Sequence, residues 1–193
     1  VILPLYLKYG VNLVKYLRGM FALALYDKNK EHLLLARDPF GIKPLYYAYT
    51  SKGFIFSSEI KPLISSGLVK EELNIEKRDE FLQLQFSTGR DTLIKGIKRV
   101  LPGEVIIVNE GKVIERFRNQ ALPNRSNKRF NETTAIDTLE KALKESLSIH
   151  LRSDVPVGLF FSGGVDSTSI LSLMTSINNK PPLTYTAGFE NTG

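Results

Sequence analysis

The chain has 193 residues, of which 42% are hydrophobic and 24% are charged. This composition is that of an ordinary globular protein with one domain or two small ones, and it argues against intrinsic disorder. The formal net charge is +6, but the 26 Lys and Arg are spread among 20 acidic residues instead of forming one block, which argues against a nucleic-acid partner.

The sequence contains no cysteine, which excludes disulfides, thiolate metal sites and a cysteine nucleophile among these residues. No apolar run approaches the roughly 18 residues of a membrane span, and the start at Val1 lacks the pattern of a signal peptide. We therefore expect a cytoplasmic protein with no membrane partner. The chain begins without methionine inside an apolar stretch and ends just after a strand-like segment, and we interpret both ends as cuts.

The first 118 residues predict a strand-rich α+β domain. Leucine and valine residues between positions 3 and 17 recur at helical spacing that is broken near Gly10, which predicts one or two short helices. Apolar runs at 21–25 and 33–36 predict a hairpin, and because neither run alternates we expect both of its faces to be covered. Further elements are expected as strands at 45–49 and 53–57, a helical turn at 60–65, an amphipathic helix at 75–85, and a hairpin of 104–108 with 112–117 around Gly111.

The composition changes at residues 119–131, which are polar and basic with one proline and predict an exposed linker. Beyond it, leucine and isoleucine at helical spacing predict a helix from about 136 to 151, with Asn131 or Thr133 as its N-cap. A buried strand at 155–161, a helix at 166–177 and a strand at 183–186 then complete a βαβ unit of a parallel sheet.

The most informative segment is VGLFFSGGVDST at 157–168, an apolar strand that runs through two glycines into a helix. Such a turn directs backbone N–H groups and the positive end of the helix dipole at one spot, which predicts an anion site. Gly163 and Gly164 allow a phosphate to approach the backbone closely, while Ser162, Ser167 and Thr168 can add hydroxyl donors.

Asp166 would repel a bound phosphate unless it holds Mg²⁺ that the phosphate oxygens also bind. The loop is not a Walker A sequence, because it has no GxxxxGK[ST] pattern and no lysine. The alternative interpretation is that the two glycines only make a tight connection between a strand and a helix. Both interpretations stay open at the level of the motif alone.

SGGVDS after an apolar strand resembles the pyrophosphate loop of ATP pyrophosphatases, and SDVPVG at 153–158 makes the approach to it similar to that of asparagine synthetases. The first part of the chain agrees independently. Its segments GMFALALYD, ARDPFGIKPLYY, SSEIK and GIKRVLPG resemble, in order and spacing, the second half of the glutaminase domain of glutamine-hydrolysing asparagine synthetases.

This resemblance implies a fold and a set of domains. Residues 1–118 would be the C-terminal portion of a type 2 glutamine amidotransferase domain, a partial Ntn-type layered β sandwich with helices. Residues 119–131 would be the linker, and residues 132–193 would begin an α/β ATP-pyrophosphatase domain with a parallel sheet, similar to adenine nucleotide α hydrolases.

The resemblance also assigns a site, with Asp166 as the metal ligand. Adenine would lie against Phe160 and against Ala187, where the family usually has valine or isoleucine. The residues that would bind ATP and its pyrophosphate are Phe160, Ser162, Gly163, Gly164, Val165, Asp166, Ser167, Thr168 and Ala187.

The implied function is synthesis of asparagine from aspartate, glutamine and ATP through a β-aspartyl-AMP intermediate, with ATP and Mg²⁺ bound. The resemblance leaves a homodimer open. The N-terminal cysteine that is the family's glutaminase nucleophile is absent, so we expect no glutaminase activity from this chain alone. The alternatives are a related ATP-dependent amidotransferase or cyclase acting on another carboxylate, and a non-catalytic scaffold module.

Six other residues receive structural interpretations. Arg37 and Asp38 are expected to form an ion pair at a strand end, and Lys43 and Glu59 to belong to the scaffold. His32 and His150 have no second ligand at metal spacing and are expected to be structural.

Overall fold

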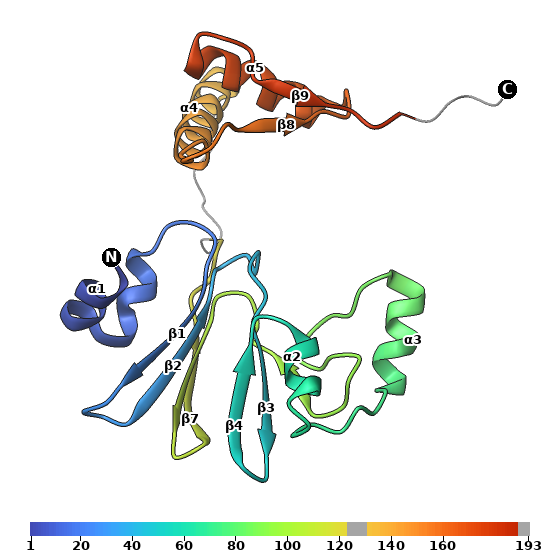
Figure 1. Cartoon of the computed structure of the whole chain (residues 1–193). Coiled ribbons are helices and arrows are strands. Elements are labelled where there is room, and N and C mark those ends of the chain that lie inside the picture. The colour runs from blue at the N-terminus through green and yellow to red at the C-terminus, as the bar shows by residue number, and fades with distance from the viewer. Residues whose placement is uncertain (123–130, 189–193) are drawn as a thin grey trace, which may run out of the picture. The chain divides into compact units, whose positions relative to one another are not determined.

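The computed structural model describes residues 1–122 and 131–188, and the chain divides into two compact units, 1–125 and 126–193 (Figure 1). Most of the linker expected at 119–131 lies outside the described residues, and the domain bounds stay a prediction. Each unit is considered by itself. Within the described residues, no helix combines the length and the apolar character needed to cross a membrane.

Unit 1 begins with two short helices, as the sequence predicts: α1 (Ile2–Tyr9) and the 3-10 helix η1 (Gly10–Tyr16). The helix axis changes at Gly10, whose φ of 58° lies in the left-handed region. The Tyr6 hydroxyl donates a 2.8 Å hydrogen bond to the Asp27 carboxylate at the end of the first strand. This bond fastens α1 to the adjacent sheet.

Sheet A has four antiparallel strands in the order β1-β2-β6-β7: β1 (Ala22–Asp27), β2 (His32–Arg37), β6 (Glu104–Asn109) and β7 (Lys112–Arg118). Both predicted hairpins are confirmed. Glu110 and Gly111 both have positive φ, at 46° and 73°, as a two-residue type I′ turn requires. The prediction that both faces of the first hairpin are covered is wrong for β1, which lies at the edge of the sheet and exposes alternate side chains, whereas the last four residues of β2 are buried.

Sheet B has the order β4-β3-β5: β3 (Tyr46–Thr50), β4 (Gly53–Ser57) and β5 (Ile97–Arg99). The expected helical turn is α2 (Ile60–Ser65), and the expected helix at 75–85 is α3 (Ile75–Leu84), which begins at Asn74, whose side chain accepts the Lys77 N–H. The amphipathic packing expected for α3 is not found, because none of its residues is buried. The short strand β5 was not among the expected elements.

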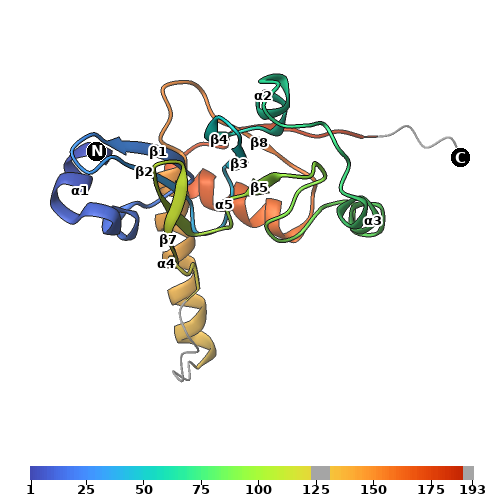
Figure 2. The same cartoon turned by 90° about the horizontal axis from the view of Figure 1, so that it is seen from below.

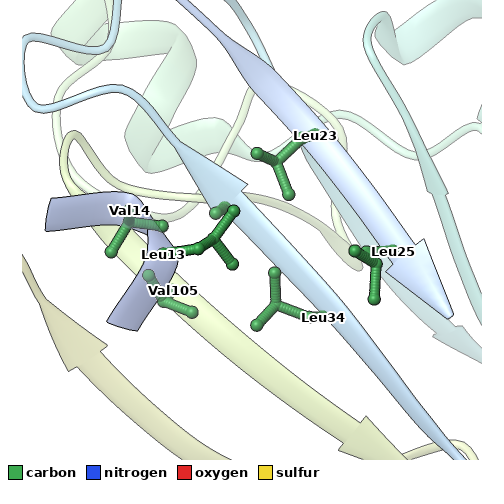
Figure 3. Close-up of a cluster of buried hydrophobic side chains, with 7 residues drawn as sticks. Leu13, Val14, Leu23, Leu25, Leu34 and Val105 are labelled. Carbon is green, nitrogen blue, oxygen red and sulfur yellow. The ribbon is translucent and has the colours of Figure 1, made fainter. Parts of the chain in front are cut away.

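The core of unit 1 lies on both sides of sheet A. On one side, Leu13 and Val14 of η1 pack on side chains of β1, β2 and β6, as Figure 3 shows for Leu23, Leu34 and Val105. On the other side, Leu35 and Ile106 of sheet A pack on side chains of sheet B, and a third cluster lies between sheet B and α2. Successive residues of β2 and β6 therefore face different layers. Helices α1 and α2 lie at opposite sides of the two sheets (Figures 1 and 2).

A buried carboxylate also joins the two sheets. Glu104 accepts two hydrogen bonds from Arg90, at 2.9 and 2.7 Å, one from Arg116 at 3.2 Å and one from the Leu101 N–H at 2.7 Å. Both arginines also donate to the Tyr47 hydroxyl. Burial by itself would raise the pKa of Glu104, but the bonds from Arg90, Leu101 and Arg116 outweigh it and the pKa is lowered.

Unit 2 contains α4 (Glu132–His150), β8 (Gly158–Phe160), α5 (Val165–Asn178) and β9 (Leu183–Tyr185). The Asn131 side chain accepts the Thr134 N–H at 2.8 Å and starts α4 as predicted. β8 and β9 pair in parallel, which confirms the βαβ unit. The prediction of a buried strand at 155–161 is wrong in two respects: β8 is shorter, and none of its residues is buried, with Gly158 and Phe160 exposed and Leu159 half-buried.

Candidate functional site

The candidate site is the turn between β8 and α5, at the carboxyl end of the strand. Gly163 has φ of +77°, and a Cβ built there meets no heavy atom within 4 Å. Gly164 has φ of −76° and is the N-cap residue of α5, with its carbonyl accepting the Thr168 N–H at 3.0 Å. The first glycine thus provides a backbone conformation that side chains disfavour, and the second begins the helix.

The backbone donors of this turn are available to a ligand. Within the part of the chain that the structure describes, the N–H groups of Ser162, Gly163, Val165, Asp166 and Ser167 have no protein acceptor. The Gly164 N–H has only a long contact of 3.5 Å to the Ser162 hydroxyl. These donors and the positive end of a 14-residue helix meet at an exposed position, an arrangement that favours anions.

The hydroxyl groups of the turn are less free than the sequence suggests. Ser167 Oγ donates to the Gly164 carbonyl at 3.1 Å and lies 3.2 Å from Ser162 Oγ. Because a hydroxyl has one proton, Ser162 then donates to Ser167, and both hydroxyls are satisfied inside the loop. The Thr168 hydroxyl has no such partner within the described residues.

Asp166 lies in the first turn of α5 and is exposed. The described residues contain no group of three or more acidic or histidine side chains that could hold a metal ion by themselves. A single exposed carboxylate fits Mg²⁺, which commonly takes one or two protein carboxylates and completes its shell with phosphate oxygens and water. The chemistry of the site therefore fits an ion that binds together with a polyphosphate.

The two strand ends beside the turn carry the residues expected near adenine. Phe160 is 89% exposed, and its ring lies 6.3 Å from that of Tyr185, its register partner on β9. The Tyr185 ring covers Gly158, where an added Cβ would lie only 2.8 Å from it. Ala187 is exposed, two residues beyond the end of β9.

Sequence reasoning missed Tyr185 and Thr186 at this site. The Thr186 hydroxyl donates to the Phe161 carbonyl at 2.7 Å, immediately before the turn. Only the parallel register of β8 and β9 brings these residues to the loop, and no local pattern could have indicated the contact.

The sequence-predicted pair in unit 1 has a structural role, but not as an ion pair. Arg37 donates to the carbonyls of Lys43, Gly41 and Val100 at 2.7, 2.6 and 2.7 Å. Asp38 accepts the N–H groups of Phe40, Ile42 and Lys43. Arg37 and Asp38 are buried, and the backbone groups of the loop that follows β2 supply the hydrogen bonds that a buried charged side chain needs.

The electrostatics of the same loop agree with this role. Burial lowers the pKa of Arg37. Burial alone would raise the pKa of Asp38, but the backbone N–H groups outweigh it and the pKa is lowered.

His150 of unit 2 was also expected to be structural. Its Nδ1 lies 2.8 Å from the Ser146 carbonyl oxygen inside its own helix.

Comparison with known proteins identifies the class of both units. Residues 1–118 match the family described as the glutamine amidotransferase domain, and residues 138–193 match the family described as asparagine synthase. The chain is therefore a glutamine amidotransferase-type protein with part of a synthetase domain. More narrowly, it belongs to the asparagine synthetase family.

Individual relatives agree with this assignment. The chain is 35% identical over 196 residues to asparagine synthetase [glutamine-hydrolyzing] 1 of Bacillus subtilis (strain 168), with 100% of this chain and 30% of the relative covered. It is 36% identical over 205 residues, with the same coverage, to a putative asparagine synthetase of Mycobacterium tuberculosis (strain ATCC 25618 / H37Rv). It is also 33% identical over 180 residues to the amidase chyE of Penicillium rubens, with 92% of this chain and 26% of the relative covered. The chain thus spans under a third of the length of these relatives.

Proposed function

We propose that a full-length protein containing this chain makes asparagine from aspartate, glutamine and ATP, and that unit 2 supplies the first part of its ATP site. The observation that carries the proposal is the turn at 162–167, which lies at the carboxyl end of a parallel strand. Its backbone N–H groups, apart from that of Gly164, have no protein acceptor within the described residues. Ligands of parallel α/β sheets bind at such strand ends. In the same proposal, unit 1 is part of an Ntn-type sandwich and unit 2 begins an adenine nucleotide α hydrolase-like domain.

The chemical step asks for stabilisation of a leaving pyrophosphate. The side-chain carboxylate of aspartate attacks the α-phosphorus of ATP, the bond between the α-phosphorus and the bridging oxygen breaks, and β-aspartyl-AMP forms. Negative charge grows on the leaving oxygens, which the N–H groups of Gly163, Val165 and Asp166 and the amino end of α5 would stabilise. The Asp166 carboxylate would hold Mg²⁺, which neutralises phosphate charge when bound.

The second step forms the amide. Ammonia released from glutamine attacks the activated carbonyl carbon, and AMP leaves. Phe160 and Ala187 would flank the adenine and keep the nucleotide oriented with its phosphates toward the turn. Arg37 and Asp38 take no part in either step, because both are occupied with the backbone of the loop after β2.

The test is Asp166→Ala in the full-length protein. We expect MgATP-dependent pyrophosphate release to be abolished while glutamine hydrolysis is retained, because the carboxylate serves only the phosphate site. Asp137→Ala, which removes an exposed carboxylate from α4, is the matched control and should keep both activities. Equal pyrophosphate release by the parent and the Asp166 variant would remove Asp166 from this role.

A second candidate is amidation or cyclisation of a carboxylate other than aspartate. The chain is 33% identical to a fungal protein whose name, an amidase, gives an amide chemistry other than asparagine synthesis, and this identity is close to the 35% identity to the named synthetase. The same loop would serve either acceptor, so the acceptor itself has to be varied. Pyrophosphate release measured with aspartate and with a panel of other carboxylic acids separates the two candidate functions. A protein that releases no pyrophosphate with any carboxylate would instead be a scaffold module.

A further inference from the structure

Thr186 makes a contact with the start of the turn that the proposed function does not use. Its hydroxyl donates to the Phe161 carbonyl at 2.7 Å, and the Phe161 N–H donates to the Tyr185 carbonyl at 2.8 Å. Phe161 is therefore held on both of its backbone polar groups by consecutive residues at the end of β9. It is the last residue before the turn that is fixed in this way.

Fixing the Phe161 carbonyl also fixes the next amide. The described residues contain no cis peptide bond, and in a trans peptide the C=O and the following N–H point in opposite directions in one plane. With its oxygen bound to Thr186, the Phe161–Ser162 peptide plane directs the Ser162 N–H away from β9. That N–H has no protein acceptor within the described residues.

The turn needs such a constraint because Gly163, the residue after Ser162, allows a wide range of backbone conformations. Gly163 has φ of +77° and open space around its Cβ position, so neither its own side chain nor a neighbour restricts the peptide before it. Donors that are already oriented cost no reorganisation when charge develops on a ligand. The Thr186 hydroxyl, one residue beyond the end of β9, makes the contact that supplies this orientation.

We propose that Thr186 is a positioning residue for the polyphosphate site: its hydroxyl orients the Ser162 amide toward the pyrophosphate of the bound nucleotide. The proposal rests on the proposed function. Thr186 itself does not touch the reacting atoms, and its methyl group is not required. Serine should therefore replace it, whereas valine, which has the same shape without the hydroxyl, should not.

The experiment compares Thr186→Val, Thr186→Ser and Thr184→Val in the full-length protein. Thr184 lies on β9 opposite Leu159, and its exposed hydroxyl has no partner within the described residues, so its valine variant controls for a β-branched apolar residue on this strand. Three quantities are measured for each protein: kcat for MgATP-dependent pyrophosphate release, inhibition by inorganic pyrophosphate, and binding of adenosine.

We expect Thr186→Val to lower kcat and to weaken inhibition by pyrophosphate by up to about tenfold, the upper end of the usual range for one lost neutral hydrogen bond. Both measures should stay within about twofold of the parent in the two other variants, since neither loses a hydrogen bond. Thr186→Ser keeps the hydroxyl, and Thr184→Val removes a hydroxyl that has no partner within the described residues. Adenosine binding should be unchanged in all three, which shows that the strand ends remain folded.

Three results would overturn the proposal: equal pyrophosphate inhibition of Thr186→Val and Thr184→Val, a serine variant as impaired as the valine variant, or a parallel loss of adenosine binding. A parent protein that releases no pyrophosphate with any carboxylate would instead refute the proposed function, so the two failures are distinguishable.

Discussion

The two units of the chain place their apolar side chains differently. Unit 1 buries leucine, valine and isoleucine on both faces of sheet A, with Leu35 and Ile106 fully buried between two sheets. In unit 2, Met174 is the only buried hydrophobic residue among those that the structure describes, and Leu139 and Phe160 remain exposed. The geometry of the candidate site therefore depends on local hydrogen bonds and glycine conformation, whereas the geometry of unit 1 depends on packing.

The largest test of this comparison is a pair of leucine truncations. Leu35→Ala should lower the free energy of unfolding of unit 1 by about 2–5 kcal/mol, because the side chain is fully buried between the sheets. Leu139→Ala, at a position 60% exposed on α4, should change stability by no more than about 0.5 kcal/mol. Urea unfolding followed by tyrosine fluorescence measures the effect of Leu35→Ala, since every tyrosine except Tyr185 lies in unit 1. Hydrogen exchange of the α4 amides measures the effect of Leu139→Ala in unit 2. Comparable effects of the two truncations would contradict the contrast between the units.

A smaller effect is expected at the carboxylate between the sheets. Glu104→Gln should destabilise unit 1 by about 3 kcal/mol at pH 7, the low end for a broken buried pair because Arg90 and Arg116 are partly exposed and can be hydrated. The folded-state pKa of Glu104 is lowered, so its contribution is present above the ordinary value of 4.5 and is lost as the pH falls through the folded-state pKa.

The difference between parent and Glu104→Gln should therefore shrink when the unfolding curves are repeated near pH 3. Residual acid sensitivity in the variant is expected from Asp38, whose pKa is also lowered. A parent–variant difference that stayed constant with pH would show that the carboxylate charge is not what stabilises this junction.

The smallest effect concerns the loop of unit 2. Gly163→Ala should lower the free energy of unfolding of unit 2 by about 1 kcal/mol, because a residue with a side chain is strained at φ of +77° even though the space is open. Gly164→Ala should cost less, since φ is −76° and the added Cβ would lie at an ordinary 3.6 Å from Ser162 Oγ. Hydrogen exchange of the α5 amides measures both, and an equal acceleration by the two substitutions would show that the loop is not held by backbone conformation.

The sequence predicted local structure well because the signals were local. Period and turn residues were sufficient for both hairpins of sheet A, for α4 with its Asn131 cap, and for the βαβ unit. β5 was missed because three residues with two basic side chains carry no strand pattern, and its pairing with β3 is set by contacts distant in sequence. The burial of β8 was overestimated because apolar composition shows what a strand could bury, not what covers it.

Only those residues of the candidate site that lie in one continuous sequence motif could be predicted. Gly163, Gly164 and Asp166 form one continuous motif, and their placement at a strand end followed from it. The contacts of Arg37 and Asp38 could not be read in the same way, because Arg37 binds the carbonyl of Val100, 63 residues away. Thr186 was missed for the same reason, since its contact to Phe161 crosses 25 residues through the strand register.

The close approach of Tyr185 to Gly158 also restricts how this sequence can vary among its relatives. A Cβ at position 158 would lie 2.8 Å from the ring and 3.2 Å from the Leu183 carbonyl oxygen. A larger residue at 158 is compatible with the same strand pairing only when the aromatic ring at 185 moves away or is replaced by a shorter side chain. The two positions are thus expected to change together during divergence, although they lie 27 positions apart in the chain.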